Sequence, residues 1–154
     1  MSKQLHLVVV GKLKDPHFEA IEKDFLKRIN SPELIIHEVR ASAVNKEIEG
    51  EALTKKIKEI SPSSTPHIIA LSEWGKKMTS VDFALWTQDL IERPNKVIFV
   101  IAGAEGFSEQ FLKGCQEKIS LSALTFPHKF ARLLIVEQLY RAQTIRLKIG
   151  RAHV

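Results

Sequence analysis

The residues best suited to hold a ligand lie in a short loop that follows a run of six apolar residues. Residues 97–102 are apolar without interruption, and they lead into residues 103–106, which have glycine at both ends, before a helix-like pattern begins at Ser108. This order is typical of a buried strand, a tight loop and a helix start, and the glycines let backbone approach a ligand closely. The loop alone leaves three interpretations open: a phosphate site, a site for another cofactor, or a compact turn without a ligand.

Common nucleotide and metal motifs do not account for this loop. The segment "VVVGKLKD" offers one glycine where the dinucleotide fingerprint needs three, and the sequence has no Walker A pattern. No His, Asp or Glu cluster has ligand spacing, so we predict no metal site. Cys115 is the single cysteine and lies in a helical pattern without an evident base, which favours a structural role over a catalytic one.

Strand and helix patterns alternate along the chain. The β-branched, apolar runs that predict strands cover residues 4–10, 34–39, 67–72, 96–102 and, more weakly, 119–124. The helical patterns cover residues 16–29, 45–60, 79–93 and 130 to about 148. This alternation predicts one α/β domain over residues 1–154, with a mostly parallel sheet and helices on both of its faces.

The loops after the strands are where such sheets bind ligands. Ligands bind outside the carboxyl ends of parallel strands, so residues 11–14, 72–76, 103–106 and 122–128 are the candidate segments. The loop at residues 103–106 is therefore one of several that can meet at a single sheet edge.

Composition and charge narrow the class of protein. With 154 residues, 44% hydrophobic and 27% charged, the chain is long enough for a core without disulfides or metals. It has neither a membrane-span pattern nor a signal-peptide pattern, so we expect a cytoplasmic protein without a membrane partner. The net charge is +5, and residues 128–154 hold six basic residues against one acid. That surplus is typical of an RNA-facing edge, although a solvated face is the plainer interpretation.

Three segments of the chain resemble motifs of one family. "AGAEGFS" is similar to an "IGGxEG" loop, and "SLSALTFPHKFARLLIVEQLYRA" matches "SLSxxTxPHxxxRxxxxEQxYRA" at nearly every fixed position. Earlier in the chain, "LSEWGKKMTSVDFA" is similar to "LDxxGKxxSSxxFA". On these motifs the chain resembles the RlmH family of SPOUT-class methyltransferases, which act on bacterial 23S ribosomal RNA.

The resemblance implies a fold, a cofactor and partners. It implies an α/β fold with a C-terminal trefoil knot, a homodimer, and S-adenosylmethionine bound in the knot loops. It also implies methyl transfer to N3 of a pseudouridine in 23S rRNA, within the ribosome. Carried over by motif, the cofactor-binding residues are Leu71, Gly103, Ser122, Ala123, Leu124, Thr125, Phe126 and Pro127.

The methyl transfer that the resemblance implies also requires removal of the proton from N3 of the target base. A histidine or carboxylate near the target can assist it, and the candidates are His128, Glu105 and His153. The resemblance places the C-terminal segment over the methyl-transfer centre, which gives Arg151 and His153 catalytic roles. The plainer interpretations are that His128 caps the last helix and that Glu105 is a solvated loop residue.

RNA contacts are expected on the last helix. Arg132, Arg141 and Lys148 are the candidates for phosphate binding, although Arg141 can instead pair with Glu137 four residues earlier. Two alternatives stay open: a non-catalytic RNA-binding module with the same fold, and a related methyltransferase that acts on another nucleotide.

Overall fold

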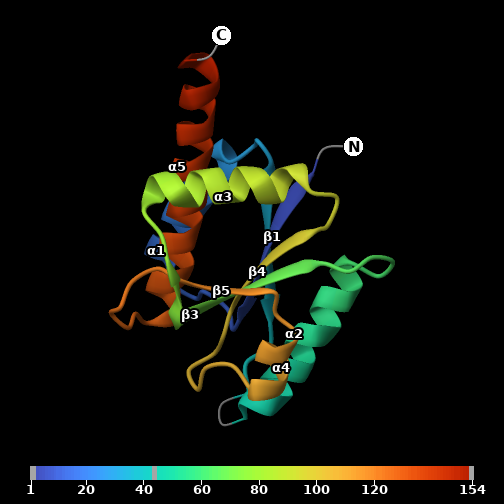
Figure 1. The fold of residues 1–154 in the computed structure, drawn as a ribbon. Helices are drawn as coiled ribbons and strands as arrows, with labels where there is room; N and C mark the ends of the chain where they lie inside the picture. Colours follow the sequence, from blue (N-terminus) through green and yellow to red (C-terminus); the bar gives the residue numbers. More distant parts are fainter. Residues whose placement is uncertain (1–2, 43–44, 153–154) are drawn as a thin grey trace.

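Five parallel strands form a single sheet in the computed structural model, which describes residues 3–42 and 45–152 (Figure 1). The strands are β1 (Gln4–Val10), β2 (Glu33–Val39), β3 (His67–Lys77), β4 (Val97–Ile101) and β5 (Glu117–Ser120). Their order across the sheet is β2-β1-β4-β3-β5, and every neighbouring pair is parallel. The predicted parallel α/β sheet is confirmed.

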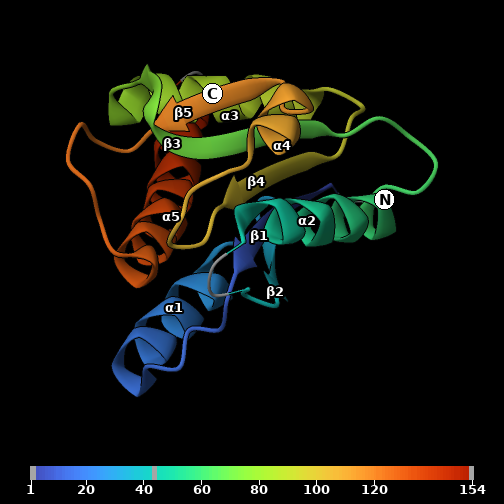
Figure 2. The ribbon, with the colours of Figure 1, turned by 90° about the horizontal axis from the view of Figure 1, so that it is seen from below.

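Helices cover both faces of this sheet. They are α1 (Pro16–Arg28), α2 (Lys46–Ile60), α3 (Ser80–Glu92), α4 (Glu109–Lys113) and α5 (His128–Ala152). Helices α1, α3 and α5 pack together on one face, and α2 and α4 lie on the other (Figure 2). No helix among the described residues is long and apolar enough to cross a membrane.

The central strands supply one core on each face of the sheet. In β1, Leu7 and Val9 point to the side of α5, whereas Val8 and Val10 point to the side of α2, because successive strand side chains alternate. Both sets are buried, as the uninterrupted apolar run predicts for a central parallel strand.

Capping side chains begin the helices near the predicted positions. Asp15 accepts the first free N–H groups of α1, Asn45 those of α2, Thr79 one of α3 and Ser108 one of α4. The helix starts at Pro16, after Asn45 and after Thr79 agree with the sequence pattern.

Two strands differ from the predicted bounds. Strand β3 continues to Lys77 instead of ending at residue 72, because it resumes pairing with β5 after a bulge. Strand β5 ends at Ser120, so residues 121–124 lie in a loop instead of the predicted strand. There the Ser120 hydroxyl bonds the Ser122 carbonyl at 2.7 Å, a local bond that competes with strand pairing.

Candidate functional site

Segments of three neighbouring strands enclose one pocket of about 600 Å³: the bulge within β3 and the loops after β4 and β5. The strand order β4-β3-β5 brings these segments together at one edge of the sheet. The lining residues are 71–74 from the bulge of β3, 101–107 after β4, and Leu121, Ser122, Leu124, Thr125, Phe126 and His128 after β5, with Leu112 and Ala131.

The bulge in β3 brings its side of the pocket into place. Leu71 and Lys76 both pair with Ile119, so residues 72–75 have no partners in β5. A Cβ atom on Gly75 would lie 2.5 Å from the carbonyl carbon of Ile119, so only glycine allows this close approach. The segment predicted as an open loop is therefore a bulge anchored at both ends.

Hydrogen bonds tie the segment after β5 to this bulge. The Leu124 N–H donates to Ser122 Oγ at 3.0 Å, and Thr125 Oγ1 donates to Glu73 Oε2 at 2.6 Å. The second bond crosses from one wall of the pocket to the other. The two segments thus hold each other at the mouth of the pocket.

The loop after β4 forms the third wall as a tight turn. The Gly106 N–H donates to the Gly103 carbonyl at 3.0 Å, and Gly106 has φ +79°, a left-handed conformation that favours glycine. Helix α4 then begins after Ser108, whose Oγ accepts the Phe111 N–H at 3.1 Å. Residues 97–113 therefore form a strand, a turn and a capped helix.

The charges around the pocket favour one kind of ligand. Apolar side chains suited to a flat ring line its walls: Leu71, Ile101, Leu121, Leu124 and Phe126. Its acidic lining residues are the exposed Glu73 and Glu105, and the lining set contains no lysine or arginine. A phosphate group would meet two carboxylates, whereas a cationic ligand with an apolar ring is attracted by this lining.

Most of the predicted cofactor residues line this pocket. They are Leu71, Gly103, Ser122, Leu124, Thr125 and Phe126. Ala123 and Pro127 lie in the same segment but outside the lining set, and the Pro127 carbonyl accepts the Phe130 and Ala131 N–H groups at the start of α5. The cofactor set is thus brought together apart from these two residues.

The catalytic candidates divide into two groups. Glu105 and His128 line the pocket, and His128 is also the first residue of α5. Arg151 belongs to the last turn of α5, but its side chain is outside the part that the structure describes. His153 lies outside the described residues altogether.

Glu73 and Trp74 are lining residues that motif reasoning did not single out. Trp74 is 87% exposed at the rim of the pocket, an unusual position for the largest side chain. The signal that could have identified it is a lone tryptophan in the polar stretch "SEWGKK", directly after an apolar run.

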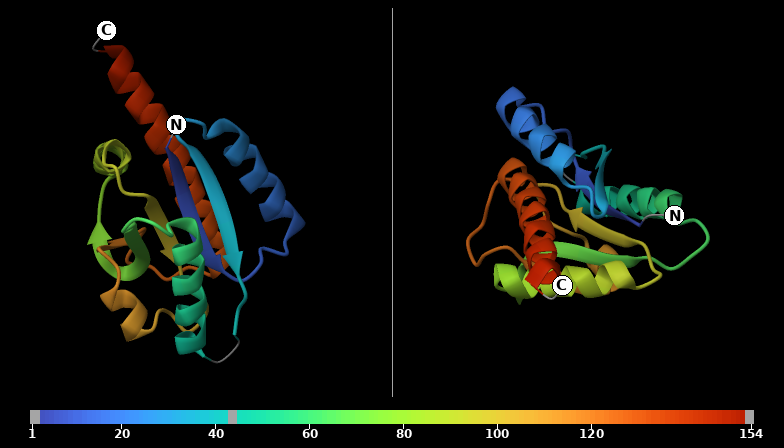
Figure 3. Two further views of the ribbon diagram at one scale, coloured as in Figure 1. Left: turned by 90° about the vertical axis from the view of Figure 1, so that its right-hand side faces the viewer. Right: turned by 90° about the horizontal axis from the view of Figure 1, so that it is seen from above.

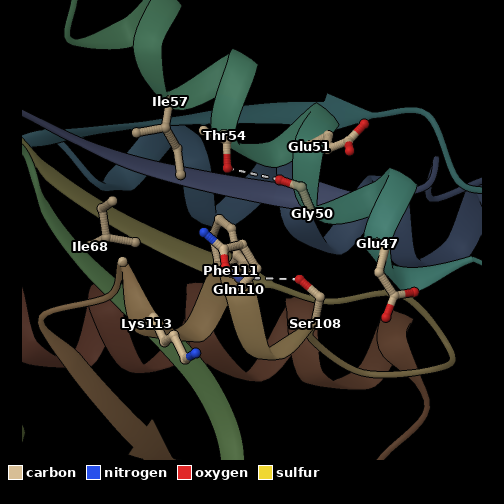
Figure 4. Close-up of a pocket in the computed structure, with 11 residues that line it drawn as sticks. Glu47, Gly50, Glu51, Thr54, Ile57, Ile68, Ser108, Gln110, Phe111 and Lys113 are labelled. Atoms are coloured by element: carbon tan, nitrogen blue, oxygen red, sulfur yellow. Dashed lines mark hydrogen bonds between the residues drawn. The ribbon is translucent and has the colours of Figure 1, made fainter.

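A second pocket, of about 710 Å³, lies between α2 and α4 (Figure 4). Ile57, Ile68 and Phe111 give it an apolar floor. It is larger than the first pocket but lies between helices rather than at the ends of the strands, and none of the predicted cofactor residues lines it. We therefore place the functional site in the pocket formed by the three strand-end segments.

Arg132 does not present its charge to RNA. Its side chain is 9% exposed, and it donates to Glu22 at 2.7 and 2.8 Å and to Glu38 at 2.6 Å. Burial alone would lower the pKa of Arg132, yet the hydrogen bonds of both carboxylates raise it. This arrangement contradicts the prediction of a phosphate contact: Arg132 is a buried link between α1, β2 and α5.

The other two basic candidates are on the surface. Arg141 donates to Glu137 at 2.6 Å in an exposed pair four residues apart, and its hydrogen bond to that carboxylate raises the pKa of Arg141. Lys148 is exposed near the end of α5.

Cys115 lies outside the lining set of this pocket. Burial raises the pKa of the Cys115 thiol to about 11, so this thiol stays protonated at neutral pH. Within residues 3–42 and 45–152, no group of three His, Cys, Asp or Glu side chains is arranged to hold a metal ion.

Comparison with known proteins gives consistent matches over almost the whole chain. Residues 3–149 match the family model described as "Predicted SPOUT methyltransferase". The chain is 36% identical over 149 residues to ribosomal RNA large subunit methyltransferase H of Bacteroides fragilis, covering 90% of this chain and 92% of that protein. It is 40% identical over 143 residues to the protein of the same name from Coprothermobacter proteolyticus, with 92% and 94% covered.

Solved structures share the fold at low sequence identity. A tRNA (m1G37) methyltransferase from Aquifex aeolicus superposes with a TM-score of 0.58 at 13% identity, over 90% of this chain and 70% of that one. A probable methylase family protein from Haemophilus influenzae gives 0.59 at 13% identity, over 96% and 70%. These two likenesses concern the fold alone.

Proposed function

Because the chain belongs to the SPOUT methyltransferases, in the family of the ribosomal RNA large subunit methyltransferase H proteins, we propose that it transfers a methyl group from S-adenosylmethionine to N3 of a pseudouridine in 23S rRNA. Because the proposed substrate is ribosomal RNA, we also propose that the protein acts in the cytoplasm. The trefoil knot that the family implies stays a prediction.

One observation carries the proposal. The three segments that the family motifs mark as cofactor-binding are far apart in the sequence, yet they enclose a single pocket with apolar walls and acidic lining. S-adenosylmethionine combines an uncharged adenine ring with a sulfonium cation, an ammonium group and one carboxylate, so its net charge is positive. The residues present suit such a ligand better than they suit a nucleotide phosphate.

The main contribution of the protein is alignment. S-adenosylmethionine supplies an electrophilic methyl group, and transfer from a sulfonium disperses charge rather than creating it. The apolar walls at Leu71 and Phe126 would hold the ring, while backbone groups of the turn at residues 103–106 offer hydrogen bonds to its edge. Fixing the methyl group and the target in line provides most of the acceleration.

Proton removal from the target base falls to groups beside the same pocket. His128 and Glu105 both line it, and either can accept a proton from N3 directly or through a water molecule. We propose His128 as the base, because the start of α5 fixes its backbone, and Glu105 as the alternative.

The proposal is tested on ribosomal RNA from cells that lack the gene. Mass mapping of 23S rRNA should show one pseudouridine without its methyl group, and purified protein with S-adenosylmethionine should restore it. Restoration at a different nucleotide would support the second methyltransferase alternative. An rRNA with unchanged modification would favour the non-catalytic RNA-binding alternative.

Arg141 and Lys148 are expected to contact the RNA backbone. Replacing both with glutamine should weaken RNA binding and lower the salt slope of log K by roughly one unit per lost phosphate contact. The exposed pair with Glu137 contributes little to stability, so a phosphate can take its place. The matched control is Arg93→Gln, which removes an arginine from an equally spaced exposed pair with Asp89 and should leave the slope unchanged. An unchanged slope in the double variant would show that neither residue contacts the RNA backbone.

The direction of α5 supports a homodimer. This helix begins in the pocket at His128 and has 25 residues, so its end lies about 37 Å away. Figures 1 and 3 show its last turns projecting beyond the sheet. If Arg151 and His153 act on the target base, they must act at the pocket of a second subunit. Exposed apolar side chains, including Leu147 near the end of α5, are available for that contact.

Subunit mixing tests the shared site. A chain ending at Ile149 should keep cofactor binding but lose turnover by at least ~100-fold, the scale expected for lost acid–base help and alignment. Mixing it with a full-length chain whose own pocket is blocked should restore turnover, because hybrid dimers join an intact pocket with an intact tail. Full activity of the shortened chain would contradict the shared site. So would full activity of a protein that sedimentation shows to be a monomer.

A further inference from the structure

Glu49 is a buried carboxylate with one oxygen that lacks a partner. It lies in the first turn of α2 and is 5% exposed. Its Oε2 accepts the Ser42 N–H at 2.9 Å, while Oε1 has no hydrogen-bond partner among the described residues. A buried acceptor without a donor destabilises a fold, so its retention calls for a reason other than stability.

The carboxylate of Glu49 lies directly beneath the turn after β4. A Cβ atom on Gly103 would be 2.6 Å from Glu49 Oε1 and 2.9 Å from Oε2. Gly103 is not among the described glycines with positive φ, so the backbone conformation does not demand glycine there. Any side chain at this position would have to displace the Glu49 carboxylate, which fills that space.

A second contact presses α2 against the same loop. A Cβ atom on Gly50 would lie 2.7 Å from Ser108 Oγ, and Figure 4 shows Gly50 on the face of α2 that looks toward α4. Helix α2 therefore touches the turn at Gly103 and the cap of α4 at Ser108. Displacing its first turn would move the wall of the cofactor pocket.

We propose that Glu49 is a positioning residue for this wall: its free Oε1 accepts a backbone N–H of residues 103–105 when the turn closes around S-adenosylmethionine. The inference rests on the proposed function and assigns Glu49 no contact with the reacting atoms. It explains why an unpartnered acceptor is kept beside the turn, since the acceptor gains its donor only in the closed state. The Glu49 carboxylate and Gly103, which leaves room for it, then together set the position of the turn.

Glu49→Gln in the full chain tests the proposal, because the amide can still accept the Ser42 N–H but places a donor where Oε1 was. Calorimetric titration should give about tenfold weaker S-adenosylmethionine binding, the scale of a lost hydrogen bond to a charged group. The melting temperature without ligand should not fall, whereas the rise on adding ligand should shrink. The matched control is Glu47→Gln, which removes an exposed carboxylate from the same helical turn and should change neither quantity.

Further variants separate the possible outcomes. Glu49→Asp keeps the charge but draws it away from Gly103, so it should also weaken binding if Glu49→Gln fails to fold. In a double variant, the losses from Glu49→Ala and Gly103→Ala should be less than additive, because both disturb one contact. The role of Glu49 would be overturned by unchanged affinity in Glu49→Gln or by additive losses in the double variant. It would also be overturned if Glu49→Gln lowered the melting temperature without reducing the rise on adding ligand. Absence of binding in the unaltered chain would overturn the proposed function itself.

Discussion

Replacing Gly103 with valine should weaken the binding of S-adenosylmethionine by about 5- to 150-fold, because forcing extra carbons into a filled space usually costs about 1–3 kcal/mol. The new side chain would project toward Glu49, whose carboxylate is 2.6 Å from the position of its first carbon. Either the Glu49 carboxylate or the turn must move, and the turn forms one wall of the pocket. Calorimetric titration measures the loss directly.

The control for this variant is Gly114→Ala. A Cβ atom there would make an ordinary 3.5 Å contact with the Phe111 carbonyl, outside the proposed cofactor pocket. Its affinity should equal that of the unaltered chain. Circular dichroism should show that the valine variant remains folded, and undiminished affinity in that variant would exclude the turn from the binding site.

Replacing Arg132 with alanine should lower the free energy of unfolding by about 3–5 kcal/mol, the usual cost of leaving buried carboxylates without their partner. Glu22, with a side chain 9% exposed, would lose both of its donors, and Glu38 would lose one. Urea unfolding monitored by circular dichroism measures the change.

Lys129→Ala provides the comparison for Arg132. Lys129 lies one turn earlier in α5, and its exposed pair with Asp15 at 3.1 Å should be worth at most about 1 kcal/mol. If Arg132→Ala costs no more than Lys129→Ala, the network with Glu22 and Glu38 does not support the fold. A reduced salt slope for RNA binding in a folded Arg132 variant would show that Arg132 contacts the RNA backbone.

Local sequence patterns were sufficient for the parts of the fold that depend on local chemistry. The helix starts near Asn45 and Ser108 and the uninterrupted apolar run of β4 have short-range causes, and the structure has them where the patterns predict. The convergence of three loops also followed from the sequence, since parallel strands place their carboxyl ends at one edge. The strand order β2-β1-β4-β3-β5 did not, because pairing between distant strands leaves no local mark.

The errors have the same origin in long-range contacts. The surplus of basic residues lies in the C-terminal segment, but a count of charges does not tell which cations are paired, and Arg132 is paired with residues far earlier in the chain. Glu49 looked like one more polar residue of an amphipathic helix. Its position beneath Gly103 appears only when α2 is packed against the turn after β4.

The measurement that tests the account most directly is a calorimetric titration of the unaltered chain with S-adenosylmethionine, with ATP as a phosphate-bearing comparison. The apolar walls and the carboxylates of Glu73 and Glu105 predict saturable binding of S-adenosylmethionine and no detectable binding of ATP. Binding of ATP in place of S-adenosylmethionine, or no heat of binding with either, would contradict the assignment of this pocket to a methyl donor.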